Sequence, residues 1–406
     1  MNILYTITSY PPSLGGAQLY AHEIIKRIAK EHNVKVMSFF DTNRNDWLLG
    51  TTLRTPGQKH FYKYEGVDVE RISFDKKEKS RMSQYVYTYY FNKMHNINAL
   101  AKFIEGKLNF GNKGIDLIHN IRVGREPLSY ASYNFARKLN VPFVFTPLHH
   151  PRWSHWFFKE YQQLYRKADA LFSLTPYEKE IYESFGVEEN KVFVTGTGAV
   201  LVDKANPDEF KRKYDLSDNI ILFIGQGYKY KGMDILLKAA KIVFKTIEDA
   251  NFVFIGPHTK YSKKLFKKQS DRRIKHLGKV DLQIKTDSLA ACKIFCLPSK
   301  QESFGAVFLE AWMFEKPVIA ADTGQLRCVI KDGGNGYLVK PSPELIADKI
   351  IKLLKNDDLR NELGTSGRKT VESEFNWDIL CQKTINAYES LIGNLDARQY
   401  ERVLGQ

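Results

Sequence analysis

The stretch NILYTITSYPPSLGGAQLYAHEIIKRIAKEHNVKVMSFF (residues 2–40) decides the fold class of this chain. It begins with a short apolar run at 2–8, followed by a loop rich in Pro and Gly at 9–18. Apolar residues then recur at helical spacing through 19–32, and a second apolar run follows at 34–40. Strand, glycine loop, helix and strand in this order form a βαβ unit, which predicts a parallel sheet.

The same pattern restarts in the second half of the chain. A polar segment at 203–219 precedes an apolar strand at 219–225, the loop GQGYKYKG at 225–232 and a helical stretch at 233–247. A chain of 406 residues also suits two domains better than one. We therefore expect an α/β protein built from two Rossmann-like domains in series.

The expected domain boundaries are 1–200 for the first Rossmann-like domain and 201–375 for the second. The remaining segment, 376–406, is amphipathic and helical. It either packs against one domain or crosses back to brace the first.

The net charge of +15 favours anionic partners such as phosphorylated small molecules, acidic membrane surfaces or nucleic acid. The excess divides almost evenly, with +8 in residues 1–200 and +7 in the rest, so no single arm carries it. A dedicated nucleic-acid binder concentrates its charge in a stripe. We therefore expect no nucleic-acid partner.

The four cysteines, at 292, 296, 328 and 381, form no CxxC pair and are expected to be small buried residues in a reducing compartment. The first predicted strand begins at Asn2, so we expect no signal peptide. No apolar run approaches the roughly 18 residues of a membrane-spanning helix. The expected location is the cytoplasm, with a possible peripheral position on the inner face of the cell membrane.

Two glutamates flank a glycine turn in QESFGAVFLEAW (301–312). The turn follows an apolar strand, and ligands of parallel sheets bind beyond the carboxyl ends of strands. A helix starting near Gly305–Ala306 would offer its free N–H groups to a phosphate. Glu302 and Glu310 could then bind hydroxyl groups on either side of a diphosphate. The alternative is a solvated loop acid and an exposed helix acid, but the apolar neighbours of Glu310 argue against it.

ESFGAVFLE (302–310) resembles the Glu-x7-Glu motif of retaining glycosyltransferases of family four, which have the GT-B fold. The resemblance covers most of the chain and includes LGGAQLYAHEIIKRIA (14–29), LHH (148–150), GQGYKYKG (225–232), LPSKQESFG (297–305) and GNGYLV (334–339). It implies two Rossmann-like domains facing across a cleft. The first would be on the acceptor side, the second would hold a nucleotide-sugar donor, and the C-terminal helices would cross back.

The resemblance also implies roles for individual residues. Glu302 would contact the hydroxyls of the transferred sugar, Glu310 would bind the ribose, and Lys231 would neutralise the leaving phosphates. His149, or His150, would lie near the reacting carbon; from the residues alone, a hydrogen-bonded structural histidine is the alternative. The other implied donor-binding positions are Gly15 and Gly16 in the first loop, Gln226, Val280 beside the base, and the backbone of Phe304, Gly305, Ala306 and Val307.

Three positions depart from the family pattern. Gln226 stands where the family usually has an arginine that pairs with the diphosphate, and Lys229 could replace it only as a point charge. Arg327, in GQLR (324–327), replaces an acid, and TGAV (197–200) replaces the usual Asn-Gly-Val-Asp. These departures bear on donor identity and catalytic efficiency more than on the fold.

The expected function is transfer of a sugar from a nucleotide-sugar donor to a glycan, lipid-linked or small-molecule acceptor, with retention of configuration, in cell-surface glycan or glycolipid biosynthesis. No Asp-x-Asp lies in a suitable loop, so no metal or other cofactor is expected. Two alternatives remain: a nucleotide-sugar epimerase or hydrolase on the same scaffold, and a non-catalytic module that binds a nucleotide.

Two stretches mix aromatic and basic residues, RMSQYVYTYYFNKMH (81–95) and RWSHWFFKEYQQLYRK (152–167). Such a composition suits helices that lie on an anionic membrane surface. The alternative is that both stretches pack into the core of the first domain. A membrane contact would favour a lipid-linked acceptor.

Overall fold

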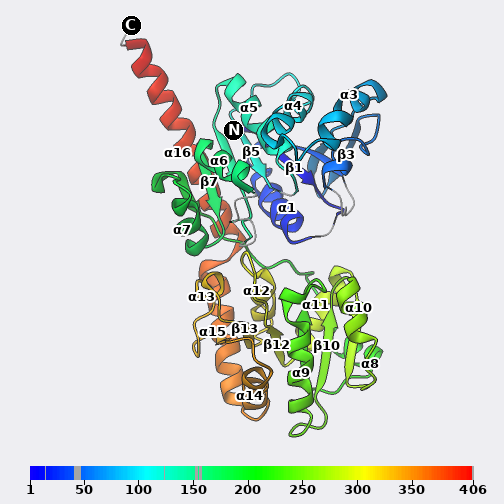
Figure 1. Ribbon diagram of the computed structural model, residues 1–406. Coiled ribbons are helices and arrows are strands. Elements are labelled where there is room, and N and C mark those ends of the chain that lie inside the picture. The colour runs from blue at the N-terminus through cyan, green and yellow to red at the C-terminus, as the bar shows by residue number, and fades with distance from the viewer. Residues whose placement is uncertain (14, 41–46, 123, 151–153, 155–157, 405–406) are drawn as a thin grey trace. The chain divides into compact units, whose positions relative to one another are not determined.

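The computed structural model of this chain describes residues 1–406 except 14, 41–46, 123, 151–153, 155–157 and 405–406. The chain divides into two compact units (Figure 1). Unit 1 comprises Met1–Gly196 together with Trp377–Gln406, and unit 2 comprises Thr197–Asn376. The last helix thus belongs with the amino-terminal half of the chain.

Unit 1 contains an eight-stranded sheet in the order β3-β4-β2-β1-β5-β6-β7-β8. All neighbouring strands pair in parallel except β3 and β4, which are antiparallel. The strands are β1 (Asn2–Ser9), β2 (Asn33–Phe40), β3 (His60–Tyr64), β4 (Val67–Arg71), β5 (Leu117–Ile121), β6 (Phe143–Thr146), β7 (Ala170–Ser173) and β8 (Val192–Val194). The helices are α1 (Gly16–Ile28), α2 (Trp47–Gly50), α3 (Lys76–Tyr87), α4 (Lys93–Glu105), α5 (Pro127–Leu139), α6 (Lys159–Lys167), α7 (Pro176–Ser184) and α16 (Trp377–Leu404).

Helix α16 completes the core of unit 1. Its Tyr388 is fully buried, and the Tyr388 hydroxyl lies 2.9 Å from the Tyr5 hydroxyl and 2.5 Å from Nδ1 of His119. The Tyr388 ring also stacks on Phe172 at a centroid distance of 5.7 Å. Side chains from β1, β5 and β7 therefore meet a residue that follows them by more than 200 positions.

Unit 2 contains a six-stranded parallel sheet in the order β11-β10-β9-β12-β13-β14. The strands are β9 (Ile220–Ile224), β10 (Asn251–Ile255), β11 (Ile274–Gly278), β12 (Ile294–Leu297), β13 (Val318–Ala321) and β14 (Gly336–Val339). The helices are α8 (Pro207–Tyr214), α9 (Met233–Val243), α10 (Lys260–Phe266), α11 (Leu282–Ala291), α12 (Ala306–Trp312), α13 (Gly324–Arg327), α14 (Pro343–Leu354) and α15 (Asp357–Glu374).

The aromatic stretch 81–95 is not one helix. It contains the end of α3, a turn at 88–92 and the start of α4. Met82, Val86 and Tyr89 are buried, so part of the stretch does belong to the core. In the second stretch, residues 152–153 and 155–157 lie outside the described residues, whereas Leu164 and Tyr165 of α6 are buried.

The expectation of four buried cysteines is wrong at one position. Cys292, Cys296 and Cys381 are buried, but Cys328 is exposed, because it follows the short surface helix α13. None of the helices in the described part of the chain is long and apolar enough to cross a lipid bilayer.

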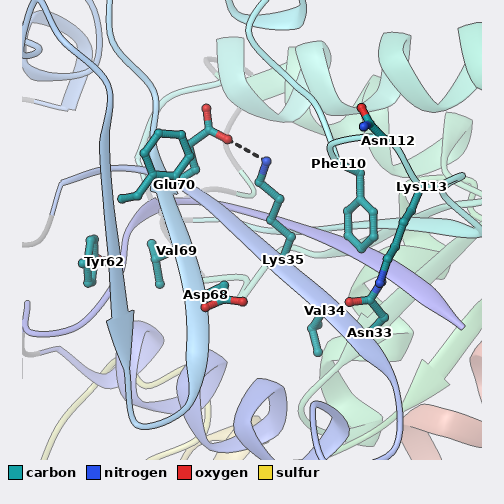
Figure 2. A pocket seen from close by; sticks show the side chains of 11 residues that line it. Asn33, Val34, Lys35, Tyr62, Asp68, Val69, Glu70, Phe110, Asn112 and Lys113 are labelled. Carbon is teal, nitrogen blue, oxygen red and sulfur yellow. Dashed lines mark ion pairs between the residues drawn. The ribbon is translucent and has the colours of Figure 1, made fainter.

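A pocket of about 580 Å³ lies in unit 1, between the amino end of β2, the hairpin of β3 and β4, and the loop that precedes β5 (Figure 2). Figure 2 shows Lys35 reaching toward Glu70 between the strands, and Phe110 and Lys113 on the side of the loop that precedes β5. This edge of the sheet is opposite to the carboxyl ends of the parallel strands, where ligands of such sheets bind. The pocket is therefore separate from the site predicted by the sequence.

Candidate functional site

The strand order of the unit 2 sheet reverses between β9 and β12. From β9 the chain builds outward through β10 and β11, and from β12 it builds outward through β13 and β14 in the other direction. Open α/β sheets bind their ligands beyond the carboxyl ends of the strands at such a switch point. The loops that follow β9 and β12 carry Lys231 and Glu302, which are two of the predicted site residues.

These two loops meet. Lys300 N donates a hydrogen bond to the carbonyl oxygen of Tyr230 at 2.8 Å, and Lys231 Nζ lies 2.6 Å from Glu302 Oε1. Gly232 permits this approach, because its φ of 79° favours glycine and a Cβ there would lie 2.5 Å from the carbonyl oxygen of Pro298. The structure thus brings together the predicted phosphate-neutralising lysine and the predicted sugar-binding carboxylate.

Helix α12 begins at Ala306, as the sequence predicts, and Gly305 precedes it with a φ of 84°. Phe304 is buried, while Gly305, Ala306 and Val307 are partly exposed. The first N–H groups of the helix follow directly on the loop that carries Glu302.

Glu310 is only 4% exposed, and its Oε1 lies 2.6 Å from Lys285 Nζ on helix α11. Its Oε2 is also buried, and it has no hydrogen-bond partner among the described residues. Burial raises the pKa of Glu310, and the adjacent Lys285 opposes that rise. The sequence indicated that Glu310 needs a partner but did not identify Lys285, which is 25 positions away in the chain.

The other predicted donor-binding positions of unit 2, Gln226 and Val280, lie in loops that follow strands of the sheet. Gln226 is exposed in the loop after β9, and Val280 follows β11 and is partly exposed. Arg327, which departs from the family pattern, forms a two-pronged ion pair with Asp322 at 2.6 and 2.8 Å. Its guanidinium is therefore engaged on the surface near the end of β13.

In unit 1, Gly15 and Gly16 lie at the start of α1, after the carboxyl end of β1. A Cβ at Gly15 would lie 2.4 Å from Oε1 of Gln18, whereas Gly16 faces open space. β1 and β5 are the neighbouring strands at which the order of this sheet reverses. The two glycines therefore occupy the switch point of unit 1, as Lys231 and Glu302 do in unit 2.

His149 follows β6 and is 1% exposed. Glu178 Oε1 accepts a hydrogen bond from the His149 backbone N–H at 2.7 Å, and Ser154 Oγ lies 3.0 Å from Nε2 of the ring. The preceding Leu148 has a φ of 48°, a left-handed conformation that is costly for a side chain of this kind. Strained backbone of this type clusters at functional sites, which supports the LHH turn as part of one.

Burial, with smaller contributions from Arg122 and His150, lowers the pKa of His149 to about 3. Between pH 6.5 and 3 the unfolded chain therefore binds a proton that folded unit 1 excludes, so the stability of unit 1 falls as the pH falls through this window. We expect His149→Gln to remove this contribution, about 1.4 kcal/mol per pH unit relative to wild type. Urea midpoints at several pH values measure it, with the exposed His60→Gln as control. Parallel pH profiles for wild type and His149→Gln would contradict a buried neutral His149.

The expectation that no part of the chain concentrates positive charge is wrong. Residues 260–279, over α10 and the edge strand β11, contain nine Lys or Arg residues and one acid, Asp271. Most of these basic side chains are exposed. The even division between the two halves of the chain concealed this cluster, although the cluster alone supplies the excess of positive charge in the second half.

The expectation that the protein needs no metal ion stays a prediction. Within the described ranges, no three His, Cys, Asp or Glu side chains gather in a way that could hold a metal ion.

Comparison with solved structures shows the fold. HepE of Anabaena, solved in complex with UDP, aligns with a TM-score of 0.73 and 17% identity over 96% of this chain and 100% of that one. Residues 15–198 match the family model of the glycosyl transferase 4-like domain, and residues 204–370 match that of glycosyl transferases group 1. The chain is a GT-B glycosyltransferase of the family four type.

Relatives of this glycosyltransferase differ in how much of the chain they match. An uncharacterized glycosyltransferase of Methanocaldococcus jannaschii is 26% identical over 94% of this chain and 96% of its own length. The phosphatidyl-myo-inositol mannosyltransferase of Mycobacterium leprae is 29% identical over 42% of this chain and 46% of its own length.

Proposed function

We propose that this glycosyltransferase transfers a sugar from a nucleotide-sugar donor to a glycan, lipid-linked or small-molecule acceptor, with retention of configuration and without a metal ion. The observation that carries the proposal is the presence of two ion pairs, Lys231–Glu302 and Lys285–Glu310, on the loops and helices beside the switch point of the unit 2 sheet. They combine two cations with two buried carboxylates, which suits a ligand made of sugar, diphosphate and ribose. HepE, whose fold is similar, binds UDP.

The proposed mechanism follows from the charges that develop during transfer. When the bond between the anomeric carbon and the phosphate oxygen breaks, the electron pair leaves with the diphosphate and the sugar ring gains positive character. Lys231 and the backbone amides of Phe304, Gly305 and Ala306 would stabilise the departing charge, and preorganised groups of this kind are often the largest catalytic contribution. The acceptor hydroxyl would attack from the same face, and the departing phosphate would take its proton.

A thermal-shift panel with UDP, GDP, ADP and CMP tests donor binding. A ligand at about 100 times its Kd stabilises the native state by roughly 2.7 kcal/mol, so one nucleotide should raise the melting temperature selectively. Sugar conjugates of that nucleotide are then incubated with and without acceptors. Donor cleavage without acceptor at the full turnover rate would instead support an epimerase or hydrolase, and binding without turnover would support a nucleotide-binding module.

We also propose peripheral contact with an anionic membrane, on the cytoplasmic face, through the turn between α3 and α4. Tyr87, Tyr90 and Phe91 are 74%, 54% and 91% exposed, which is unusual for three aromatic side chains within five residues. Exposed basic residues of α3, Lys76, Lys77 and Arg81, precede them. Aromatic side chains beside basic ones suit the interface of an anionic bilayer.

Co-sedimentation with vesicles tests this contact. We expect binding to phosphatidylglycerol vesicles that weakens with salt and is much weaker on phosphatidylcholine. Replacing Tyr87, Tyr90 and Phe91 together by Ser should weaken binding at least about tenfold without changing the melting temperature, since all three are exposed. Phe61→Ser, at another exposed aromatic residue, serves as the matched control. Equal binding by the triple variant would rule out this turn as the anchor.

A further inference from the structure

Side chains of helix α11 hold the first segment of unit 2, residues 200–206, in position. Four side chains of the helix hydrogen-bond the backbone of residues 200–206 at every second position. These bonds join Lys285 Nζ to the oxygen of Val200 at 3.3 Å, Thr286 Oγ1 to the nitrogen of Val202 at 3.2 Å, Gln283 Nε2 to the oxygen of Lys204 at 2.8 Å, and Asp287 Oδ1 to the nitrogen of Asn206 at 2.7 Å. The segment therefore depends on α11 for its position.

Lys285 differs from the other three because its ammonium group has a second partner. The same Nζ that donates to Val200 lies 2.6 Å from Oε1 of Glu310 on α12. One cation thus connects the segment 200–206 with the carboxylate proposed to bind the donor ribose. Within the described part of the chain, Lys285 is the sole charged side chain that pairs with Glu310.

The second carboxylate oxygen of Glu310 indicates what the pair is for. Oε2 is buried without a hydrogen-bond partner in the described residues, and a buried polar atom in this state is costly. Hydroxyl groups of a ligand would supply the missing donors. Because Lys285 occupies Oε1, it leaves Oε2 as the available acceptor and fixes the direction in which that oxygen points.

We propose that Lys285 is a positioning residue, which holds Glu310 charged and oriented for the vicinal hydroxyls of a nucleoside diphosphate and ties that carboxylate to segment 200–206. This inference rests on the proposed function of the same site. A ligand hydroxyl that donates to Glu310 weakens the bond between Glu310 and Lys285. The Lys285 ammonium group can then donate more strongly to the oxygen of Val200. Nucleotide binding and the order of segment 200–206 are therefore linked.

Calorimetric titration of wild type, Lys285→Met and Lys285→Arg with UDP and GDP from pH 5.5 to 8.5 tests the positioning role. Without the ammonium, burial raises the pKa of Glu310 further and only the backbone hydrogen bond with Val200 still opposes it, so the carboxylate stays protonated up to a higher pH than in wild type and loses its acceptor strength. We expect Lys285→Met to bind about tenfold more weakly near neutral pH, with affinity that rises with pH. Lys285→Arg keeps the charge and should restore the flatter profile of wild type.

Gln283→Ala is the matched control, because it removes a bond to the same segment without touching Glu310. It should weaken nucleotide binding far less than Lys285→Met does and should keep the pH profile of wild type. If wild type binds the nucleotide and Lys285→Met binds it equally well with the same pH profile, the positioning role is wrong. If wild type binds neither nucleotide, nor ADP or CMP, the proposed function itself fails.

Hydrogen exchange on the wild-type protein tests the link without any variant, so it does not depend on whether Lys285→Met folds. The amides of Val202 and Asn206 donate to α11. We expect their exchange rates to change at least about threefold on addition of saturating nucleotide, because the bond at Val200 in the same segment shares its Lys285 donor with Glu310. Unchanged rates in the nucleotide-bound protein would overturn the link to segment 200–206.

Discussion

Lys231→Met should lower kcat by about 100-fold to 1,000-fold, the usual cost of removing one preorganised donor from a developing negative charge. The Lys231 ammonium lies 2.6 Å from Glu302 at the switch point, where the departing diphosphate would lie. Its attraction for that group grows as the sugar–phosphate bond breaks, so the loss should appear in kcat more than in KM. Steady-state kinetics with the nucleotide sugar chosen by the thermal-shift panel measures it.

Lys241→Met is the matched control for Lys231→Met, because Lys241 lies on α9, the helix that follows the turn of Lys231, and its side chain is exposed. It should change kcat by less than about threefold, as surface changes do. Since Lys231→Met also leaves Glu302 without its cation, melting temperatures of both variants are compared first. A folded Lys231→Met protein with wild-type kcat would remove Lys231 from the leaving-group role.

Tyr388→Ala should destabilise unit 1 by about 3–5 kcal/mol, the range found when a large buried aromatic residue is truncated. The substitution opens a cavity beside Phe172 and removes the hydroxyl that contacts Tyr5 and His119. For a unit of this size the melting temperature should fall by roughly 10 °C. Differential scanning calorimetry should place this loss in the transition of unit 1 and leave that of unit 2 unchanged.

Two further variants separate the contributions of Tyr388. Tyr388→Phe keeps the ring and loses only the hydroxyl, so it should cost about 1–3 kcal/mol through the buried polar groups of Tyr5 and His119. Glu389→Ala, at the neighbouring exposed position of α16, should leave the transition of unit 1 within about 0.5 kcal/mol of wild type. Wild-type melting of Tyr388→Ala would mean that α16 contributes nothing to this core.

The fold could be predicted from the sequence because parallel strands buried on both faces read as continuous apolar runs. β1, β9 and β12 are such strands, and each is followed by a loop and a helix at the expected place. The antiparallel hairpin of β3 and β4 gave no such signal. β3 is the edge strand of its sheet, and charged and polar residues alternate with the apolar ones along the hairpin.

The candidate site could be predicted in part for a similar reason. Glu302 and Glu310 lie within one strand–loop–helix segment, so their spacing could be interpreted locally. Lys285 could not be found in this way, because it meets Glu310 only where two helices from different parts of unit 2 pack together. The residues next to Lys285 in the sequence do not distinguish a lysine in a buried ion pair from one exposed to solvent.

The return of α16 to unit 1 has a consequence for the order in which the protein is made. Unit 2 is one continuous segment, Thr197–Asn376, and can be complete while the ribosome is still adding residues. Unit 1 cannot, because Tyr388 and its neighbours are synthesised after the whole of unit 2. Until they emerge, the surface that Tyr5, His119 and Phe172 present to Tyr388 stays uncovered, and the nascent chain offers chaperones and proteases an apolar target. Translation that stops before α16 should therefore yield a folded unit 2 attached to an incompletely folded unit 1, which proteases can degrade.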